Sequence, residues 1–425
     1  VLAFEFLNAA MRPLDDFTSI IWPSEVADFE KHTHGEFTGV GIQITKPDGQ
    51  PIRVETPLED SPAFNAGVSP GDFIIAVDGE STRDMKLNDA VRKITGPIGS
   101  RVRLTMERPG QTEQFEKELE RQRIKIRSVK GWRRTPDGAS WDFMIDTENR
   151  IGYVRVSQFT KDTVRELREA ITQLDRRGGA ALILDLRFNP GGLLTAAIES
   201  CELFLDPGDA IVKTRGRAQG ERPAAEAERK AEYDLGPIII LVNEQSASAS
   251  EIVAGTLAGH NKAFIIGERT FGKGSVQNLY EIAGRTAYFK LTTALYYVPS
   301  DAAGRSWRSL HHEDGDEMWG VEPHMEVKLI PNEIRRLFEL RRRRELINRD
   351  AEAPPESLFE QPKSPSTQPE DDIAVPNDAP LIDPQLETAL SVMRMKLVSK
   401  QPWVLAPKLA NSAPPKQRPG EPVGG

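Results

Sequence analysis

The sequence is poor in several features that often mark a function. Cys201 is the only cysteine among 425 residues, so the chain holds neither an internal disulfide framework nor a cysteine-based zinc site. No apolar run approaches the roughly 18–20 residues that a membrane-spanning helix needs. There is no internal repeat, no HExxH helix, no Walker loop and no dinucleotide fingerprint. The formal net charge of −9 argues against a general affinity for nucleic acid or for an anionic membrane.

What is present is the composition of a folded chain with polar segments attached. Hydrophobic residues make up 38% and charged residues 28%. A length of 425 residues predicts two or more compact units. The first residues, "VLAFEFLNAAM", lack a basic segment and a cleavage site, and predict an amphipathic helix. An N-terminal leader or anchor would lie upstream of this sequence.

Periodicity and composition divide the chain into segments. Residues 1–35 are expected to be helical and to pack on the core. Short strands punctuated by glycine over 36–120 predict a small, partly open β-barrel with two short helices. Over 121–335, strands alternate with helices, which predicts a mostly parallel sheet with helices on its faces. The remaining segments are expected to be a solvated basic helix (336–350), a disordered linker (351–380), and a short helix with a Pro/Gly-rich tail (381–425).

Three serines at alternate positions stand between an apolar strand and an apolar helix in "VNEQSASASEIVAG" (242–255). Ser248 with Glu251 three residues later has the spacing of a capping box. One of the hydroxyls of Ser246, Ser248 and Ser250 could instead be a nucleophile at a helix N-terminus. This stretch alone favours the cap.

Two other turns favour the nucleophile over the simple helix cap. "NPGG" (189–192) follows a buried strand, and its glycines let backbone N–H groups approach an anion. "GERTFGKGSVQ" (267–277) places Lys273 between glycines, where a desolvated lysine could act as a neutral base toward a serine hydroxyl. His260 is interpreted as structural, and Asp185 and Arg187 as an ion pair at a strand end. The residues by themselves favour a serine–lysine hydrolase.

The blocks "LILDLRFNPGGLL", "LVNEQSASASEIVAGTL" and "GERTFGKGSVQ" resemble, in order, the signature blocks of the carboxyl-terminal processing (tail-specific) serine peptidases. The resemblance runs from about residue 15 to residue 330. It implies a mixed α/β fold, with a ClpP/crotonase-like peptidase core, an inserted PDZ domain and an N-terminal helical segment.

The resemblance also assigns residues. It makes Ser248 the nucleophile, Lys273 the general base and Gln277 the residue that orients the base. It places the oxyanion hole at the backbone N–H groups of Ala249 and Gly192. In "GVGIQI" it implies a loop that holds a peptide's terminal carboxylate and adds the peptide as an extra strand, formed by Gly39, Val40, Gly41 and Ile42. It implies no metal or organic cofactor.

This sequence departs from the family pattern in two places. His324 in "WGVEPHMEV" replaces the usual acid, and Gly259 stands where many members carry an acidic residue before the His260 position. The C-terminal tail has no counterpart in the family pattern.

The expected function is a serine endopeptidase that recognises C-terminal tails of proteins through its PDZ domain and cleaves through an acyl-enzyme. The partners are protein or peptide substrates and not nucleic acid, and the expected location is extracytoplasmic, in the periplasm or cell envelope. Peripheral membrane association through an upstream anchor, oligomerisation, and whether the PDZ domain inhibits or only tethers stay open. One alternative is a catalytically silent PDZ scaffold. A β-lactamase-type amide hydrolase is disfavoured, because S-x-x-K requires both residues on one helix.

Overall fold

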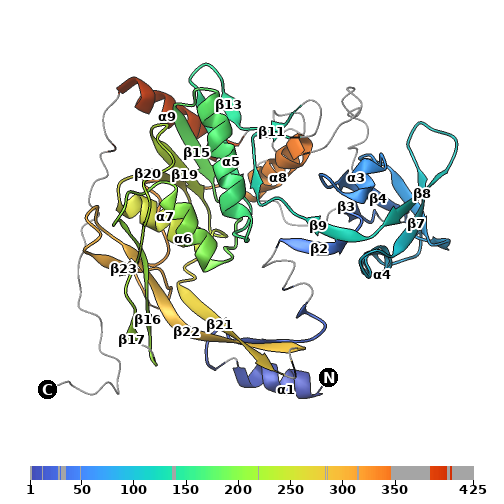
Figure 1. Cartoon of the computed structure of the whole chain (residues 1–425), viewed down its shortest axis with the longest axis horizontal. Coiled ribbons are helices and arrows are strands. Elements are labelled where there is room, and N and C mark those ends of the chain that lie inside the picture. Colours follow the sequence, from blue (N-terminus) through green and yellow to red (C-terminus); the bar gives the residue numbers. More distant parts are fainter. Residues whose placement is uncertain are drawn as a thin grey trace, which may run out of the picture.

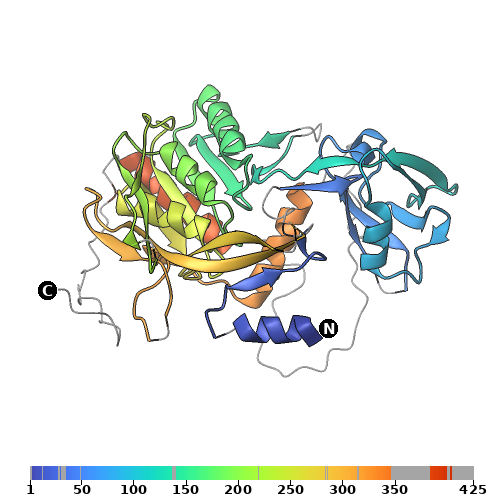
Figure 2. The ribbon, with the colours of Figure 1, turned by 60° about the horizontal axis from the view of Figure 1, so that its bottom comes forward.

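The computed structural model describes residues 2–11, 13–26, 29, 35–47, 49–135, 140–218, 220–282, 284, 286–313, 315–345, 383–399 and 403. Figure 1 separates a larger α/β body from a smaller β-rich body beside it. Figures 1 and 2 both place helix α8 (Pro331–Glu345) between the two. An ion pair of 3.2 Å joins Arg342 of α8 to Glu55 of the smaller body.

The centre of the larger body is a mostly parallel sheet, as predicted. Its strands are, in spatial order, β10 (Val129–Lys130), β14 (Ile151–Val156), β15 (Ala181–Asp185), β19 (Ile238–Val242), β20 (Ala263–Gly267) and β24 (Met325–Glu326). Strands β14, β15, β19, β20 and β24 run parallel, while β10 and β13 (Met144–Asp146) lie antiparallel to β14.

Helices cover both faces of this sheet. Alternate residues of a strand point to opposite faces, and Leu182 and Leu184 of β15 accordingly pack into a different cluster from Ile183. The first cluster includes side chains of α5 (Thr163–Arg176), α6 (Leu194–Glu202) and α7 (Ala249–Gly259). The second includes α9 (Pro384–Ser399), so the C-terminal helix covers the opposite face.

A second, antiparallel sheet packs against α7 and was not predicted as a unit. It consists of β1 (Ser19–Ile21), β16 (Ala210–Gly216), β17 (Gly220–Glu221), β18 (Ala225–Glu226), β21 (Ser275–Ile282), β22 (Ala287–Pro299) and β23 (Trp307–Ser309). The expectation of a helical segment over 1–35 is therefore wrong in part. Helix α1 spans Leu2–Met11, but residues 19–21 form a strand because they pair with β22. Residues 27, 28 and 30–34 lie outside the described part of the chain.

The smaller body contains the strands and the two short helices expected from residue 36 onward. Its sheet has the order β3 (Ile42–Thr45), β4 (Ile52–Pro57), β5 (Phe73–Val77), β7 (Arg101–Glu107) and β8 (Phe115–Glu120), with β6 (Glu80–Ser81) beside β5. Helices α3 (Pro62–Asn65) and α4 (Leu87–Ile94) complete it. The entering strand β2 (Glu36–Gly39) pairs with the leaving strand β9 (Gln122–Lys125). A short hairpin, β11 (Arg133–Arg134) and β12 (Trp141–Asp142), follows in the larger body.

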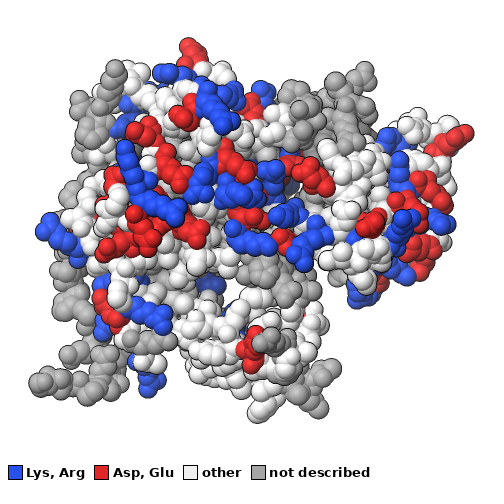
Figure 3. All heavy atoms as spheres, in the orientation of Figure 1, with Lys and Arg blue, Asp and Glu red and all other residues white. Residues whose placement is uncertain are grey.

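The basic helix is α8, and it is only partly solvated. The Arg341 side chain is buried and donates to Asp185, and Arg155 and Lys130 pair with Glu345 at the helix end. The expectation of a solvated helix is thus wrong for one face of α8, because charged side chains on that face form ion pairs inside the protein. On the surface in Figure 3, basic and acidic side chains alternate over the larger body. The expected linker 351–380 and the tail beyond residue 403 lie outside the described residues.

No helix in the described ranges is long and apolar enough to cross a bilayer.

Candidate active site

The three turns singled out from the sequence follow three neighbouring strands. "NPGG" follows β15, the serine cluster follows β19, and "GERTFGKG" follows β20. Because β15, β19 and β20 are parallel and adjacent, their carboxyl ends meet at one edge of the sheet.

Ser248 is the N-cap of α7 and has a φ of 56°, which is rare for a residue with a side chain. Its N–H donates to Glu251 Oε2 at 2.8 Å, as the capping-box spacing predicted. Backbone strain of this kind costs about 1–3 kcal/mol and persists where the surroundings enforce it. Ser248 is 9% exposed, at the positive end of the helix dipole.

The outer serines explain the alternation. Ser246 Oγ donates to the carbonyl of Leu186 at 2.9 Å, and Ser250 Oγ donates to the carbonyl of Asn189 at 3.0 Å. Ser246 thus fastens the loop before α7 to the residue after β15, and Ser250 fastens the first turn of α7 to the NPGG turn, with Ser248 between them. The sequence pattern did not indicate these two hydrogen bonds.

The two glycines of the NPGG turn are required by close contacts. Gly191 and Gly192 have φ values of 100° and 146°. A Cβ on Gly191 would lie 2.8 Å from Ser248 Cβ, and one on Gly192 would lie 2.0 Å from the Phe159 carbonyl oxygen. Within the described residues, neither the Gly192 N–H nor the Ala249 N–H has a hydrogen-bond acceptor. One of these unused donors belongs to the residue after Ser248, and the other to the residue after Gly191, which is close to Ser248.

Glu251 links the nucleophile candidate to the lysine loop. Its buried carboxylate accepts the Ser248 N–H and the Lys273 N–H (2.9 Å) on Oε2. Oε1 accepts the Gly272 N–H at 2.7 Å and the Thr270 hydroxyl at 2.5 Å. Burial raises the pKa of Glu251, and these four hydrogen bonds oppose the rise. The capping-box spacing indicated only the first of the four contacts.

Lys273 is largely removed from water. Burial lowers the pKa of its ammonium, nearby Lys290 lowers it further, and Glu251 opposes both. The Nζ atom lies 4.9 Å from the centroid of the Phe17 ring. In the described part of the chain, Lys273 makes no hydrogen bond to Ser248 Oγ or to Gln277. Lys273 and Ser248 are thus linked only indirectly, because the backbone N–H groups of both donate to Glu251. The ammonium of Lys273 lies over the face of the Phe17 ring.

Gln277 lies on β21, where its amide Nε2 donates to Ser275 Oγ at 2.8 Å and to Thr292 Oγ1 at 3.3 Å. Thr292 is its cross-strand neighbour on β22. Among the described residues, Gln277 and Lys273 are not hydrogen-bonded to each other.

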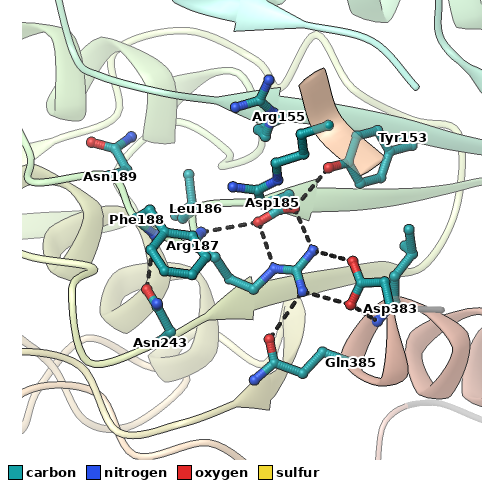
Figure 4. A network of polar contacts seen from close by, with 12 residues as sticks. Tyr153, Arg155, Asp185, Leu186, Arg187, Phe188, Asn189, Asn243, Asp383 and Gln385 are labelled. Atoms are coloured by element: carbon teal, nitrogen blue, oxygen red, sulfur yellow. Dashed lines mark hydrogen bonds and ion pairs between the residues drawn. The ribbon is translucent and has the colours of Figure 1, made fainter. Parts of the chain in front are cut away.

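A buried charge network stands directly behind the NPGG turn (Figure 4). The fully buried guanidinium of Arg187 donates to Asp185 at 2.7 Å, to Asp383 at 2.8 Å and to Gln385 Oε1 at 3.0 Å. Arg341 donates to Asp185 at 2.8 Å. Two carboxylates thus balance two guanidinium groups, and the expected Asp185–Arg187 pair is confirmed. Asp383 and Gln385 were not foreseen, because they lie beyond the linker.

The network restrains the turn that follows it. Burial alone would raise the pKa of Asp185, but the charges of Arg187 and Arg341 hold it well below its ordinary value. Phe188, which follows Arg187 and precedes the NPGG turn, has a φ of 63° and donates its N–H to Asn243 Oδ1 at 2.8 Å. The chain therefore enters the NPGG turn from a rigid support.

The loop between β2 and β3 carries the residues assigned to carboxylate binding. The Gly41 carbonyl accepts the Leu58 N–H at 2.9 Å, and the Val40 carbonyl accepts the Ala63 N–H at 3.0 Å. Within the described ranges, the N–H groups of Val40 and Gly41 have no acceptor. Gly39 ends β2, and Ile42 begins β3, which pairs only with β4 in the part of the chain described. A free strand edge beside unused N–H groups suits strand addition of a peptide terminus.

The histidines noted in the sequence have structural surroundings. His260 is buried, with Nε2 2.6 Å from the Ala210 carbonyl oxygen. His324, at the departure from the family pattern, accepts the Ile265 N–H on Nδ1 at 2.9 Å and stacks on Phe264. No cluster of three or more metal-ligating side chains occurs in the described residues.

An α/β core with a serine turn at its carboxyl edge, together with an inserted β-barrel that has a free strand edge, defines the class of PDZ-containing serine peptidases. The chain belongs to peptidase family S41: residues 150–327 match the model of that family, and residues 53–108 match the PDZ domain. The resemblance drawn from the three sequence blocks is thereby confirmed, as are the mixed α/β fold and the inserted PDZ domain that it implied.

Two curated relatives agree with the assignment. The carboxy-terminal-processing protease of Bartonella bacilliformis is 40% identical over 300 residues, which cover 69% of this chain and 65% of that protein. The carboxyl-terminal-processing protease of Picosynechococcus is 36% identical over 315 residues, covering 73% and 70%. A solved photosystem II D1 C-terminal processing protease is 29% identical with a TM-score of 0.42, covering 76% of this chain and 81% of that one. The chain thus spans about two thirds of the length of these curated relatives.

Proposed function

We propose that the protein is a serine endopeptidase that recognises the C-terminal end of protein substrates and cleaves them through an acyl-enzyme. The observation that carries the proposal is the setting of Ser248. It stands at a strained N-cap, next to Ala249 and close to the turn that holds Gly192, and the N–H groups of these two residues have no acceptor in the described residues. Donors placed in this way suit the oxyanion of an acyl-transfer intermediate.

In the proposed reaction, neutral Lys273 takes the proton of Ser248 Oγ as the oxygen attacks the scissile carbonyl carbon. The Ala249 and Gly192 N–H groups donate to the resulting oxyanion. Lys273 then gives its proton to the leaving amine, and water hydrolyses the acyl-enzyme by the same route. Burial supports this role, since it lowers the pKa of Lys273 and so favours the neutral amine. Lys273 has to turn from the Phe17 ring to Ser248, where Gln277 orients it.

The proposal gives the PDZ domain the task of holding the substrate's tail. A terminal carboxylate accepts hydrogen bonds in the loop from Gly39 to Ile42, and the tail pairs with the open edge of β3. Docking raises the effective concentration of the upstream chain at Ser248 without adding contacts at the scissile bond. Protein substrates and an extracytoplasmic location, both implied by the family, belong to this proposal.

The test is incubation of the purified protein with an unfolded protein that has an apolar C-terminus, together with labelling by a fluorophosphonate probe. Ser248→Ala should lose both turnover and labelling. Ser250→Ala, on the same helix turn, removes one buried hydrogen bond worth about 1 kcal/mol and should keep the label. Labelling of Ser248→Ala at the wild-type rate would refute the assignment. A wild-type protein that binds tails without cleaving or labelling would be the silent scaffold instead.

A further inference from the structure

The N-terminal segment reaches the candidate active site from 277 residues away in sequence. In the turn before β1, Asp15 Oδ1 accepts the N–H groups of Phe17 at 2.7 Å and Thr18 at 2.8 Å. The same oxygen accepts the hydroxyl of Thr292 on β22 at 3.0 Å. Asp15 is therefore held rigidly and is aimed at the strand beside Gln277.

The direction of the hydrogen bonds from Asp15 onward is fixed by chemistry. An ionised carboxylate can only accept, and its hydrogen bonds from Thr18, Phe17 and Thr292 lower the pKa of Asp15 although burial opposes this. The single proton of the Thr292 hydroxyl is thus donated to Asp15. The Thr292 oxygen must then accept, and it accepts from Gln277 Nε2 at 3.3 Å.

This order decides which end of the Gln277 amide faces which neighbour. The two ends of an amide side chain have nearly the same shape, so its orientation follows from the hydrogen bonds around it. With Nε2 directed at Thr292 and Ser275, the Oε1 end stays available as an acceptor. An acceptor is what the ammonium of Lys273 requires from a residue that orients it.

We propose that Asp15 is a positioning residue, which acts through the Thr292 hydroxyl to keep the acceptor end of Gln277 directed toward Lys273. The inference rests on the proposed function, in which Gln277 orients the base. Phe17, two residues further on, covers the Lys273 ammonium from the same turn. The N-terminal segment thereby completes the active site without touching the substrate.

The chain offers matched controls. Asp16 is an exposed carboxylate next to Asp15, so Asp16→Asn makes the same chemical change outside the relay, the chain of hydrogen bonds from Asp15 through Thr292 to Gln277. At position 292, Thr292→Ser keeps the hydroxyl and Thr292→Val removes it while keeping the shape. Asp15→Asn keeps the size of the side chain but allows its amide to donate to Thr292, which reverses the order of the hydrogen bonds.

The experiment measures kcat and KM of the full chain on a free-acid peptide substrate, with melting temperature as the check on folding. Asp15→Asn and Thr292→Val should each lower kcat about 10- to 100-fold, since misplacing a catalytic group costs about this much. KM should stay within about twofold of the wild type. Asp16→Asn and Thr292→Ser should retain kcat within about twofold. The double variant should lose no more than the worse single variant, because both act on one relay.

Three results would overturn the relay: a kcat for Asp15→Asn equal to that of Asp16→Asn, equal rates for Thr292→Val and Thr292→Ser, or multiplying losses in the double variant. If Asp15→Asn fails to fold, the Thr292 pair decides alone, because those variants differ by the hydroxyl. Ser248→Ala and Lys273→Ala are measured in parallel. Turnover by either of these would refute the proposed function itself, whereas their inactivity with an unaffected Asp15→Asn would refute only the relay.

Discussion

The proposed chemistry of Lys273 depends on its surroundings. Burial and the positive charge of Lys290 both disfavour its ammonium form, so its pKa lies below the ordinary lysine value of about 10.4. Only the neutral amine can accept the proton of Ser248. The rate should therefore rise with pH as Lys273 loses its proton, and should level off at a lower pH than for an ordinary lysine. A pH profile of kcat/KM measures this ascending limb.

The matching substitution is Lys273→Arg, which stays protonated throughout the usable pH range. It should abolish the ascending limb together with nearly all turnover. Lys262→Arg, at a half-exposed lysine paired with Asp206, should keep the wild-type profile. An ascending limb that survives in Lys273→Arg would remove Lys273 from the mechanism.

Gly192 allows a second test at the residue scale. An added Cβ would collide with the Phe159 carbonyl oxygen and displace the N–H beside Ser248. Loss of one oxyanion donor costs about 10²- to 10³-fold in kcat, which we expect for Gly192→Ala. Gly208 also has a positive φ, of 89°, but has open space around its Cβ position. Gly208→Ala should therefore cost only about 1 kcal/mol of backbone strain, measured by urea unfolding, and no activity.

At the scale of elements, α9 is tied to the support of the active-site turn through Asp383, the residue before the helix. It covers one face of the sheet and brings Asp383 to Arg187. Removing one partner of a buried ion pair costs about 3–5 kcal/mol. We expect Asp383→Asn to lower the free energy of unfolding by about 3 kcal/mol, the lower end of that range, since Asp185 still faces Arg187. Glu387→Gln, on the exposed side of the same helix, should change it by less than about 0.5 kcal/mol. Equal stabilities in denaturant titrations would contradict this role of Asp383.

Local patterns within and between elements could be predicted from the sequence, whereas contacts between distant elements could not. The parallel strands could be predicted because they are short apolar runs separated by helical periods, and the turns at their ends then had to share one edge. The Ser248–Glu251 cap was visible as a local spacing. By contrast, the contacts of Glu251 with Gly272 and Lys273 depend on tertiary structure, and no local pattern reveals them.

The N- and C-terminal contributions were missed for the same reason. Residues 19–21 are too short a strand to stand out, and they extend only because β22 offers an edge. Nothing near Asp383 indicates that its partner is Arg187, 196 residues earlier. The pairing of Asp185 with Arg187 could be foreseen because both lie on one strand end.

At the scale of the whole molecule, the PDZ barrel is inserted between the paired strands β2 and β9. Because β2 and β9 are hydrogen-bonded neighbours, residues 40–121 can be replaced by a short turn from Gly39 to Gln122 that keeps this strand pair. A substrate with an amidated C-terminus should raise KM for the intact protein more than it lowers kcat, since docking fails while the chemistry is unchanged. The shortened protein should treat both substrates alike. Equal KM values for free-acid and amidated substrates with the intact protein would contradict tail recognition by the barrel.

The distance along the chain between Arg187 and Asp383 has a consequence during synthesis. A ribosome adds about 5–20 residues per second, so Arg187 is made about 10–40 s before the carboxylate that completes its surroundings. Over that interval the nascent chain holds a guanidinium whose final counter-charge does not yet exist. Chains that terminate early keep this defect permanently, and the rigid support of the NPGG turn is therefore completed only in molecules whose translation has passed α9.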